Sequence, residues 1–252
     1  MHSIEMQVMT ERFQACWCAA GNHLNRQVAG GITSWLRAHP YPPFLEHLSF
    51  RHGNQLFFVR VIDTDGVVDG PGTIEGLKTI AQACHGHACI LPMQHKKLNE
   101  SWQALHSGWG LVDADTGNYV NPDQLVDDSL IEMTPWELHD MAVQVVKDYL
   151  EQNGYTIMSW QGNPSVDPSL WFVGKTKEPE WVVVRVVTYP ENQAQRPINW
   201  DEISANCRAL GTTGHFASVA LVSADQPFNG SGEAVMPLWR GKGMYFNFKG
   251  LE

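Results

Sequence analysis

The chain has 252 residues and a formal net charge of −10, from 17 Lys and Arg against 27 Asp and Glu. Only 17% of the residues are charged while 43% are hydrophobic, which excludes a disordered chain because such chains combine low hydrophobicity with high charge. The acidic balance argues against nucleic-acid binding, and no apolar run reaches the roughly 20 residues of a membrane span. The five cysteines, an odd number, predict reduced thiols in the cytoplasm.

The first half of the chain alternates between strand and helix patterns. Apolar runs flank the turn His52-Gly53-Asn54, and a helix and a further strand follow them. The predicted elements are a helix over 24–37, strands over 45–50 and 55–63, a helix over 72–83, a strand over 88–94 and an aromatic hairpin over 102–119.

The second half opens on a clear helix start. Thr134 is the expected N-cap, Pro135 and Glu137 take the first and third helical positions, and the helix is expected to end at Asn153-Gly154. A continuous β-branched run at 181–188 predicts a central strand buried on both faces. The other predicted elements are strands over 155–160 and 169–174, a helix over 200–210, a strand over 215–223 and a hairpin over 236–248.

Two segments recur in the same order in both halves. The apolar runs 56–62 and 182–187 each enclose one arginine, Arg60 and Arg185, and the pairs Gly86-His87 and Gly214-His215 follow them. The arginine precedes the glycine by 26 residues in the first half (60 to 86) and by 29 in the second (185 to 214). This pattern predicts a mixed α/β (α+β) fold of two tandem α-β-β-β-α-β repeats, each a mixed sheet flanked by helices. The repeats would form domains 1–125 and 134–252, with a linker at 126–133.

This element order resembles the restriction-endonuclease-like fold, the PD-(D/E)xK superfamily. The resemblance implies an acid near the second strand and an acid-x-Lys triplet on the third, which together bind a metal and position the attacking water. The sequence departs from that pattern, because Asp167-Pro168 is a reversed pair and the triplet positions hold Arg185-Val186-Val187 and Arg60-Val61-Ile62. Since a cation replaces the acid in both copies, the hard oxygen ligands of a metal site are missing there. The resemblance therefore implies two catalytically incomplete relatives.

Two pairs of residues shared by the halves are candidate binding residues. His87 and His215 fall where a helix ends and the last core strand begins, so we expect them to bond the final helix carbonyls. A general base is the alternative for these histidines. Arg60 and Arg185 lie inside apolar runs, where a guanidinium needs a carboxylate partner. The alternatives for the arginines are an outward-facing position or an anion site.

The C-terminal stretch and one Cys/His run are further candidates. Trp239, Arg240 and Tyr245 belong to residue types enriched at interfaces, and a binding surface competes here with a closing hairpin. The run from Cys84 to Cys89 holds four soft ligands in six residues, but its spacing matches no zinc motif. We expect a capping glycine, a turn histidine and buried cysteines, with no metal and no cofactor.

The leading hypothesis is a non-catalytic protein-interaction module of the inhibitor, immunity or adaptor kind. Its acidic charge suits a basic protein partner rather than a membrane or a nucleic acid. One alternative is a metal-dependent nuclease or other hydrolase with relocated acids, drawn from Asp63, Asp65, Asp69 and Asp167. The other alternative is a small-ligand or anion binder that uses the two strand arginines.

Overall fold

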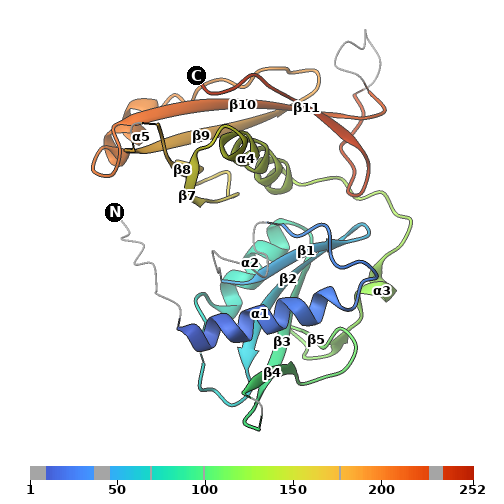
Figure 1. Ribbon diagram of the computed structural model, residues 1–252. Helices are drawn as coiled ribbons and strands as arrows, with labels where there is room; N and C mark the ends of the chain where they lie inside the picture. The colour runs from blue at the N-terminus through green and yellow to red at the C-terminus, as the bar shows by residue number, and fades with distance from the viewer. Residues whose placement is uncertain (1–9, 37–45, 69, 99, 176, 227–234) are drawn as a thin grey trace. The chain divides into compact units, whose positions relative to one another are not determined.

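The computed structural model describes residues 10–36, 46–68, 70–98, 100–175, 177–226 and 235–252. The chain divides into two compact units, Met1–Ser129 (unit 1) and Leu130–Glu252 (unit 2). Each unit is an α+β body with one β-sheet flanked by helices (Figure 1). Among the described residues, no helix is both long enough and apolar enough to cross a membrane.

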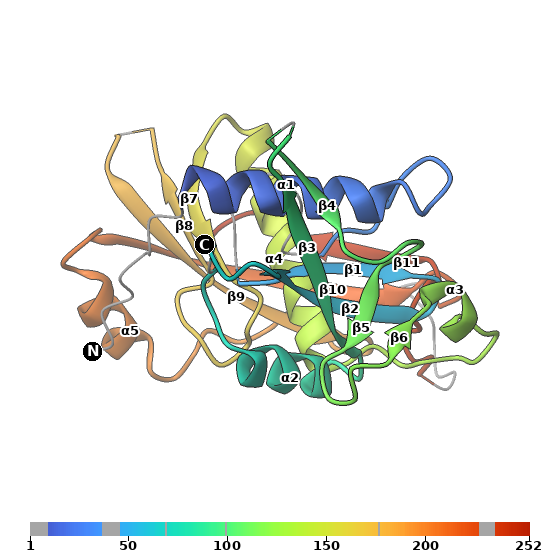
Figure 2. The ribbon, with the colours of Figure 1, turned by 90° about the horizontal axis from the view of Figure 1, so that it is seen from below.

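Unit 1 is a mixed sheet in the order β1-β2-β3-β5-β6, with β4 also paired to β3. Strands β1 and β2 are antiparallel, while β2 and β3 are parallel and are joined through α2. Helices α1 and α2 lie on opposite faces of this sheet (Figure 2). The elements are α1 (Glu11–Asn25), β1 (Leu48–His52), β2 (Gln55–Asp63), α2 (Ile74–Ala83), β3 (His87–Lys96), β4 (Ser101–Ala104), β5 (Leu111–Asp113), β6 (Tyr119–Val120) and α3 (Pro122–Leu125).

The helix predicted over 24–37 is wrong, because the helix of this region ends where that prediction begins. Thr10 caps α1 by accepting the backbone N–H of Phe13 at 3.2 Å, and a buried stripe at i, i+3, i+4 spacing follows. Gly30 and Gly31 both have positive φ, 81° and 84°, so the helix cannot continue through them. The buried stripe consists of Phe13, Cys16, Trp17, Ala20 and Leu24.

Unit 2 is a five-stranded sheet in the order β11-β10-β9-β8-β7. Strands β9 and β10 are parallel and are joined through α5, and the other neighbours are antiparallel. The elements are α4 (Pro135–Gln152), β7 (Thr156–Trp160), β8 (Leu170–Val173), β9 (Pro179–Thr188), α5 (Trp200–Cys207), β10 (Thr213–Ser223) and β11 (Met244–Phe248). The hairpin predicted over 236–248 is wrong, because β11 pairs with β10 and Trp239 instead forms a bridge with Glu132.

The central strand of unit 2 is buried on both faces over residues 181–184, the first half of the predicted run, while 185–187 are partly exposed and Thr188 is exposed. Val182 and Val184 are fully buried and pack in the core that α4 completes. Trp181 and Val183 face the other way and pack against Ile203 and Cys207 of α5. A strand covered on both sides has no exposed face for polar side chains, so any cation on it needs acceptors supplied by the chain.

The segments that recur in the sequence occupy matching places in the two parallel strand pairs. Phe57 lies opposite His87 in unit 1, and Val182 lies opposite His215 in unit 2. Arg60 and Arg185 each follow three residues later on the same strand. A short segment also pairs antiparallel with β1, through the hydrogen bond from Leu36 N to Ser49 O (2.9 Å), as β7 pairs with β8.

The stretch predicted as the linker, 126–133, falls across the boundary between the units. On the unit 1 side, Asn54 Nδ2 donates to Asp127 Oδ1 at 2.8 Å and to Ser129 O at 2.9 Å. On the unit 2 side, Met133 N donates to Leu238 O at 2.8 Å. Both ends of the stretch are therefore anchored to their own unit.

The start of α4 is joined to the C-terminal segment by a buried ion pair. The predicted capping box is confirmed, with Thr134 as N-cap and the Glu137 carboxylate bonded back to the Thr134 N–H at 2.9 Å. The same carboxylate accepts Arg240 Nε and Nη2, each at 2.8 Å. Arg240 and Glu137 are only 4% and 7% exposed. Arg240 is thus occupied inside unit 2 and does not face a partner.

Replacing Arg240 by alanine leaves the Glu137 carboxylate buried without its cation. We expect Arg240→Ala to lower the free energy of unfolding by about 3–5 kcal/mol, measured by urea denaturation. Lys242→Ala, which removes an exposed cation two residues away, should change it by less than about 0.5 kcal/mol. Equal stabilities of the two variants would contradict a structural role for the pair.

Candidate functional site

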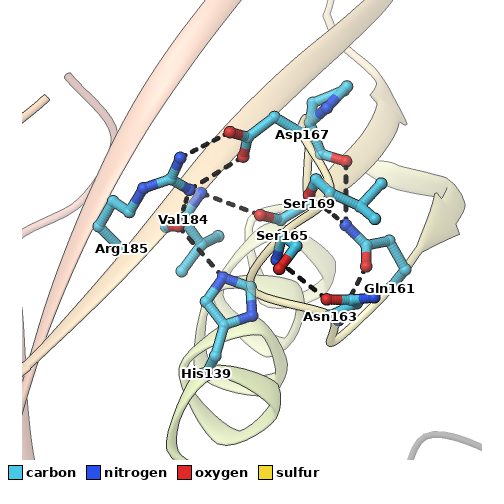
Figure 3. A network of polar contacts seen from close by, with 10 residues as sticks. His139, Gln161, Asn163, Ser165, Asp167, Ser169, Val184 and Arg185 are labelled. Atoms are coloured by element: carbon cyan, nitrogen blue, oxygen red, sulfur yellow. Dashed lines mark hydrogen bonds and ion pairs between the residues drawn. The ribbon is translucent and has the colours of Figure 1, made fainter. Parts of the chain in front are cut away.

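A polar network in unit 2 surrounds Arg185, the single cation inside the apolar run of β9 (Figure 3). The guanidinium donates to Asp167 through its two terminal nitrogens, Nη1 to Oδ1 at 2.9 Å and Nη2 to Oδ2 at 2.6 Å. Nη1 also donates to Val184 O at 2.8 Å. The side chains of Arg185 and Asp167 are only 27% and 15% exposed. Bidentate geometry and partial burial make this the dominant interaction of the network.

The loop before β8 holds Asp167 in place. The N–H of Asn163 donates to Gln161 Oε1 at 2.8 Å, and the N–H of Ser165 donates to Asn163 Oδ1 at 2.9 Å (Figure 3). At the end of this loop Ser169 is fully buried, and its Oγ accepts the N–H of Val184 at 3.2 Å. The carboxylate is therefore presented to Arg185 by a loop that is tied to itself and to β9.

His139 of α4 completes the network from the helix side. The ring is 2% exposed, with Nδ1 3.0 Å from Gly162 O and Nε2 3.3 Å from Val184 O. A neutral imidazole has one N–H and can donate to only one of these carbonyls. Burial lowers the pKa of His139 below its ordinary 6.5; the two carbonyls oppose this shift and the Arg185 charge adds to it. His139 is thus a neutral, structural contact between α4 and β9.

This arrangement neutralises the acid that a metal would need. In the part of the chain that the structure describes, no group of three or more His, Cys, Asp or Glu side chains is placed to hold a metal ion. A divalent cation at Asp167 would have to displace Arg185 from both carboxylate oxygens. What the network does chemically is fix the loop against β9 through the carboxylate that Arg185 occupies.

Asp63, one of the acids considered for a relocated hydrolase site, forms a turn. Asp63 is 6% exposed and accepts the backbone N–H groups of Asp65 (2.9 Å), Val67 (3.0 Å) and Val68 (3.0 Å). Its carboxylate therefore closes the turn after β2. Asp69 lies outside the described residues.

Arg60 occupies in unit 1 the strand position of Arg185 and donates to two backbone carbonyls. Its Nη1 donates to Pro71 O at 2.6 Å and its Nη2 to Gly70 O at 3.2 Å. The guanidinium thereby ties the loop before α2 to the central strand. Both arginines, which we weighed as anion-binding residues, thus donate to acceptors within their own unit.

The paired histidines, which we expected to bond the final helix carbonyls, each contact side chains of the neighbouring strand. His87 Nε2 is 3.0 Å from Gln55 Oε1, and the ring stacks on Phe57 with centroids 5.0 Å apart. His215 Nε2 lies 2.6 Å from Glu180 Oε2. In unit 1 the last carbonyls of α2 accept backbone N–H groups instead, for example Ala81 O from Gly86 N at 2.8 Å.

The interface-type residues near the C-terminus separate in the structure. Trp239 is half-buried, Arg240 is bound to Glu137, and Tyr245 on β11 is 57% exposed. Tyr245 is thus the member of this set that is presented to solvent. The run from 84 to 89 contributes two buried thiols, and burial raises the pKa of Cys89 to about 12. That thiol is protonated at neutral pH and is not a nucleophile.

Sequence reasoning missed His139 and Ser169. His139 lies on the apolar stripe of α4, three residues after Trp136 and four before Val143, and that spacing was the available signal for burial. Ser169 carried no such signal, because its partner Val184 is 15 residues away on another strand.

Acidification should weaken unit 2 through His139. Because the folded-state pKa is lowered, the unfolded chain binds the proton first, so stability is full above pH 6.5 and falls as the pH drops below it. Burial also lowers the pKa of His23 in unit 1. We therefore expect His139→Gln to lose less unfolding free energy than the wild type between pH 7.5 and pH 5, with the loss due to His23 remaining, measured by urea denaturation at each pH. A pH profile that overlays the wild type would contradict this role.

The comparison with known families gives a match that lies within unit 2. Residues 136–252 match the model of a family described as "Domain of unknown function (DUF8840)". This range starts one residue after Pro135, the first residue of α4, and runs to the last residue of unit 2. No match was found among curated proteins or among solved structures.

Proposed function

We propose that this chain is a non-catalytic protein-interaction module of the inhibitor, immunity or adaptor kind, built from two nuclease-like units and acting in the cytoplasm. The observation that carries the proposal is the ion pair between Arg185 and Asp167. In an active member of the resembled fold that place needs free carboxylates for a metal. Here one acid is replaced by a cation, and the remaining carboxylate is bound to that cation.

We also infer that the units arose by tandem duplication. Three features support a common origin: the matching positions of Arg60 and Arg185, the matching strand partners of His87 and His215, and the helical crossover between parallel strands in both units. Many unrelated folds contain two parallel strands joined through a helix. Matching residue positions along the strands therefore support a common origin of the two units more strongly than the shared fold does.

The charge of both units favours a basic protein partner. Residues 1–129 contain 8 Lys and Arg against 13 Asp and Glu, and residues 130–252 contain 9 against 14, so each unit carries a formal charge of −5. An acidic body attracts a cationic protein over a distance of about one Debye length and repels nucleic acid.

Metal binding and cleavage test the loss of catalysis. We expect the wild-type chain to bind Mg²⁺ or Mn²⁺ no tighter than millimolar by calorimetry and to cleave neither plasmid DNA nor single-stranded RNA. Arg185→Glu places a second carboxylate beside Asp167 and should bind Mn²⁺ at least about tenfold tighter than the wild type. Arg208→Glu, the same charge change at an exposed position, should match the wild type. Metal-dependent cleavage by the wild type that is lost in Asp167→Ala would overturn the proposal.

Salt dependence tests the partner class. A protein captured from the native cell extract and then purified should re-form a stoichiometric complex with the chain. Its affinity should fall by about tenfold or more between low and moderate salt, because the attraction is between opposite net charges. A complex that is insensitive to salt, or no complex in any extract, would argue against a basic partner.

A further inference from the structure

A polar cleft in unit 1 lies where the loop between β4 and β5 meets β6 and α3. Its volume is about 830 Å³, and its walls include Gln27, Trp109, Tyr119, Asn121, Asp123 and Gln124. Figure 2 shows β5, β6 and α3 gathered at one end of the unit 1 sheet. The volume is within the range of roughly 300–1,000 Å³ that is typical of binding pockets, and it exceeds the space needed by a single side chain.

One carboxylate in this cleft is fixed in orientation while it faces solvent. Asp123 Oδ2 accepts Trp109 Nε1 at 3.0 Å, and Oδ1 lies 2.9 Å from His52 Nε2. Trp109 is itself 6% exposed and stacks on Phe50, with ring centroids 5.8 Å apart. The Asp123 side chain nevertheless remains 60% exposed. Each oxygen accepts one described bond and has a further lone pair for a ligand.

The ionised state of Asp123 is secured by the same contacts. The Trp109 hydrogen bond holds the pKa of Asp123 below its ordinary range, and the contacts with His52 act in the same direction. The carboxylate is thus a charged acceptor at neutral pH. An exposed aspartate without such anchors loses side-chain conformational entropy when it binds a ligand. Asp123 is already held by its hydrogen bonds, so this loss is smaller for it.

An exposed aromatic ring stands in the same cleft. Tyr119 is 71% exposed, and its hydroxyl lies 3.1 Å from His106 Nδ1. The two rings meet edge to face with centroids 4.8 Å apart. Tyr119 is therefore held at its edge and tip while much of its surface faces solvent, a geometry suited to stacking with a flat cation.

The charge around the cleft favours cationic over anionic ligands. The described residues that line it include Asp123 and no Lys or Arg. Within unit 1, the sequence from 98 to 129 contains no Lys or Arg and six Asp or Glu. A cation is attracted by this field and an anion is repelled by it.

We propose that this cleft receives an arginine side chain from a basic loop of a protein partner. The flat guanidinium can donate in bidentate fashion to the remaining lone pairs of Asp123 and can stack on Tyr119, a combination that the compact ammonium of lysine does not provide. The rest of the volume accommodates the residues beside the arginine, within reach of the amide side chains of Gln27 and Gln124. The inference rests on the proposed function and assigns the contact through which the basic partner is recognised.

Titration with capped tripeptides tests this assignment. The probes are acetyl-Gly-Arg-Gly-amide, the same peptide with citrulline in place of arginine, and free L-arginine, and the readout is the assigned indole N–H resonance of Trp109. We expect a saturable shift with the arginine peptide and at least about tenfold weaker binding of the uncharged citrulline peptide. Asp123→Asn should weaken binding by about tenfold or more, and Tyr119→Ala by a smaller factor. Asp128→Asn removes the same charge from an exposed residue that does not line the cleft and should change affinity less than about twofold.

The remaining outcomes overturn the inference. These are the absence of a saturable shift, equal binding of the citrulline peptide, unchanged affinity of Asp123→Asn, or free L-arginine binding as tightly as the peptide, which would make the ligand a small molecule. Failure of the proposed function is distinguishable, because metal-dependent cleavage at Asp167 in unit 2 would leave the arginine titration of unit 1 unchanged. Loss of arginine selectivity would in turn leave the Arg185→Glu metal results unchanged.

Discussion

A partly buried cation on a central strand has to find its acceptors in the chain itself, and much of unit 2 follows from this constraint. Arg185 lies on β9 directly after residues 181–184, which pack in the cores of α4 and α5, and its side chain is 27% exposed. Its charge requires Asp167, and Asp167 in turn requires the loop that Gln161 and Asn163 order. Removal of either charge would leave the other partly buried without a partner, which would destabilise the folded unit.

A second buried pair fixes the ends of unit 2 to each other. Glu137 caps the first turn of α4 and binds Arg240, which is 103 residues later in the chain. One carboxylate thus accepts the N–H of the N-cap residue Thr134 and a buried guanidinium at once. His139, one turn from the same helix start, adds contacts to Gly162 O and Val184 O. Helix α4 is therefore positioned by polar contacts as well as by its apolar stripe.

The two units place their strand arginines alike, and each arginine ties a loop to its strand. Arg185 binds the Asp167 carboxylate, and Arg60 donates to the carbonyls of Gly70 and Pro71. In both units the guanidinium is bonded within its own unit and anchors a loop next to the central strands. The fixed carboxylate of Asp123 differs from both, since its anchors lie on one side and solvent on the other. Charge that is fully matched stabilises a fold, and charge that is fixed but exposed can recognise a ligand.

The sequence by itself determined the features that depend on neighbouring residues. The capping box of Thr134 and Glu137, the helix end at Asn153, the turn at Gly53 and the burial of residues 181–184 on both faces all follow from local backbone and side-chain preferences. The helix over 24–37 was mispredicted because α1 ends at Asn25 and the chain then passes through Gly30 and Gly31, whose positive φ does not fit a helix. Tertiary structure alone decided that Arg185 meets Asp167, that Glu137 meets Arg240 and that Asp123 meets His52. These partners are 18, 103 and 71 residues apart, and the free energy of a buried charge depends on such distant groups rather than on its sequence neighbours.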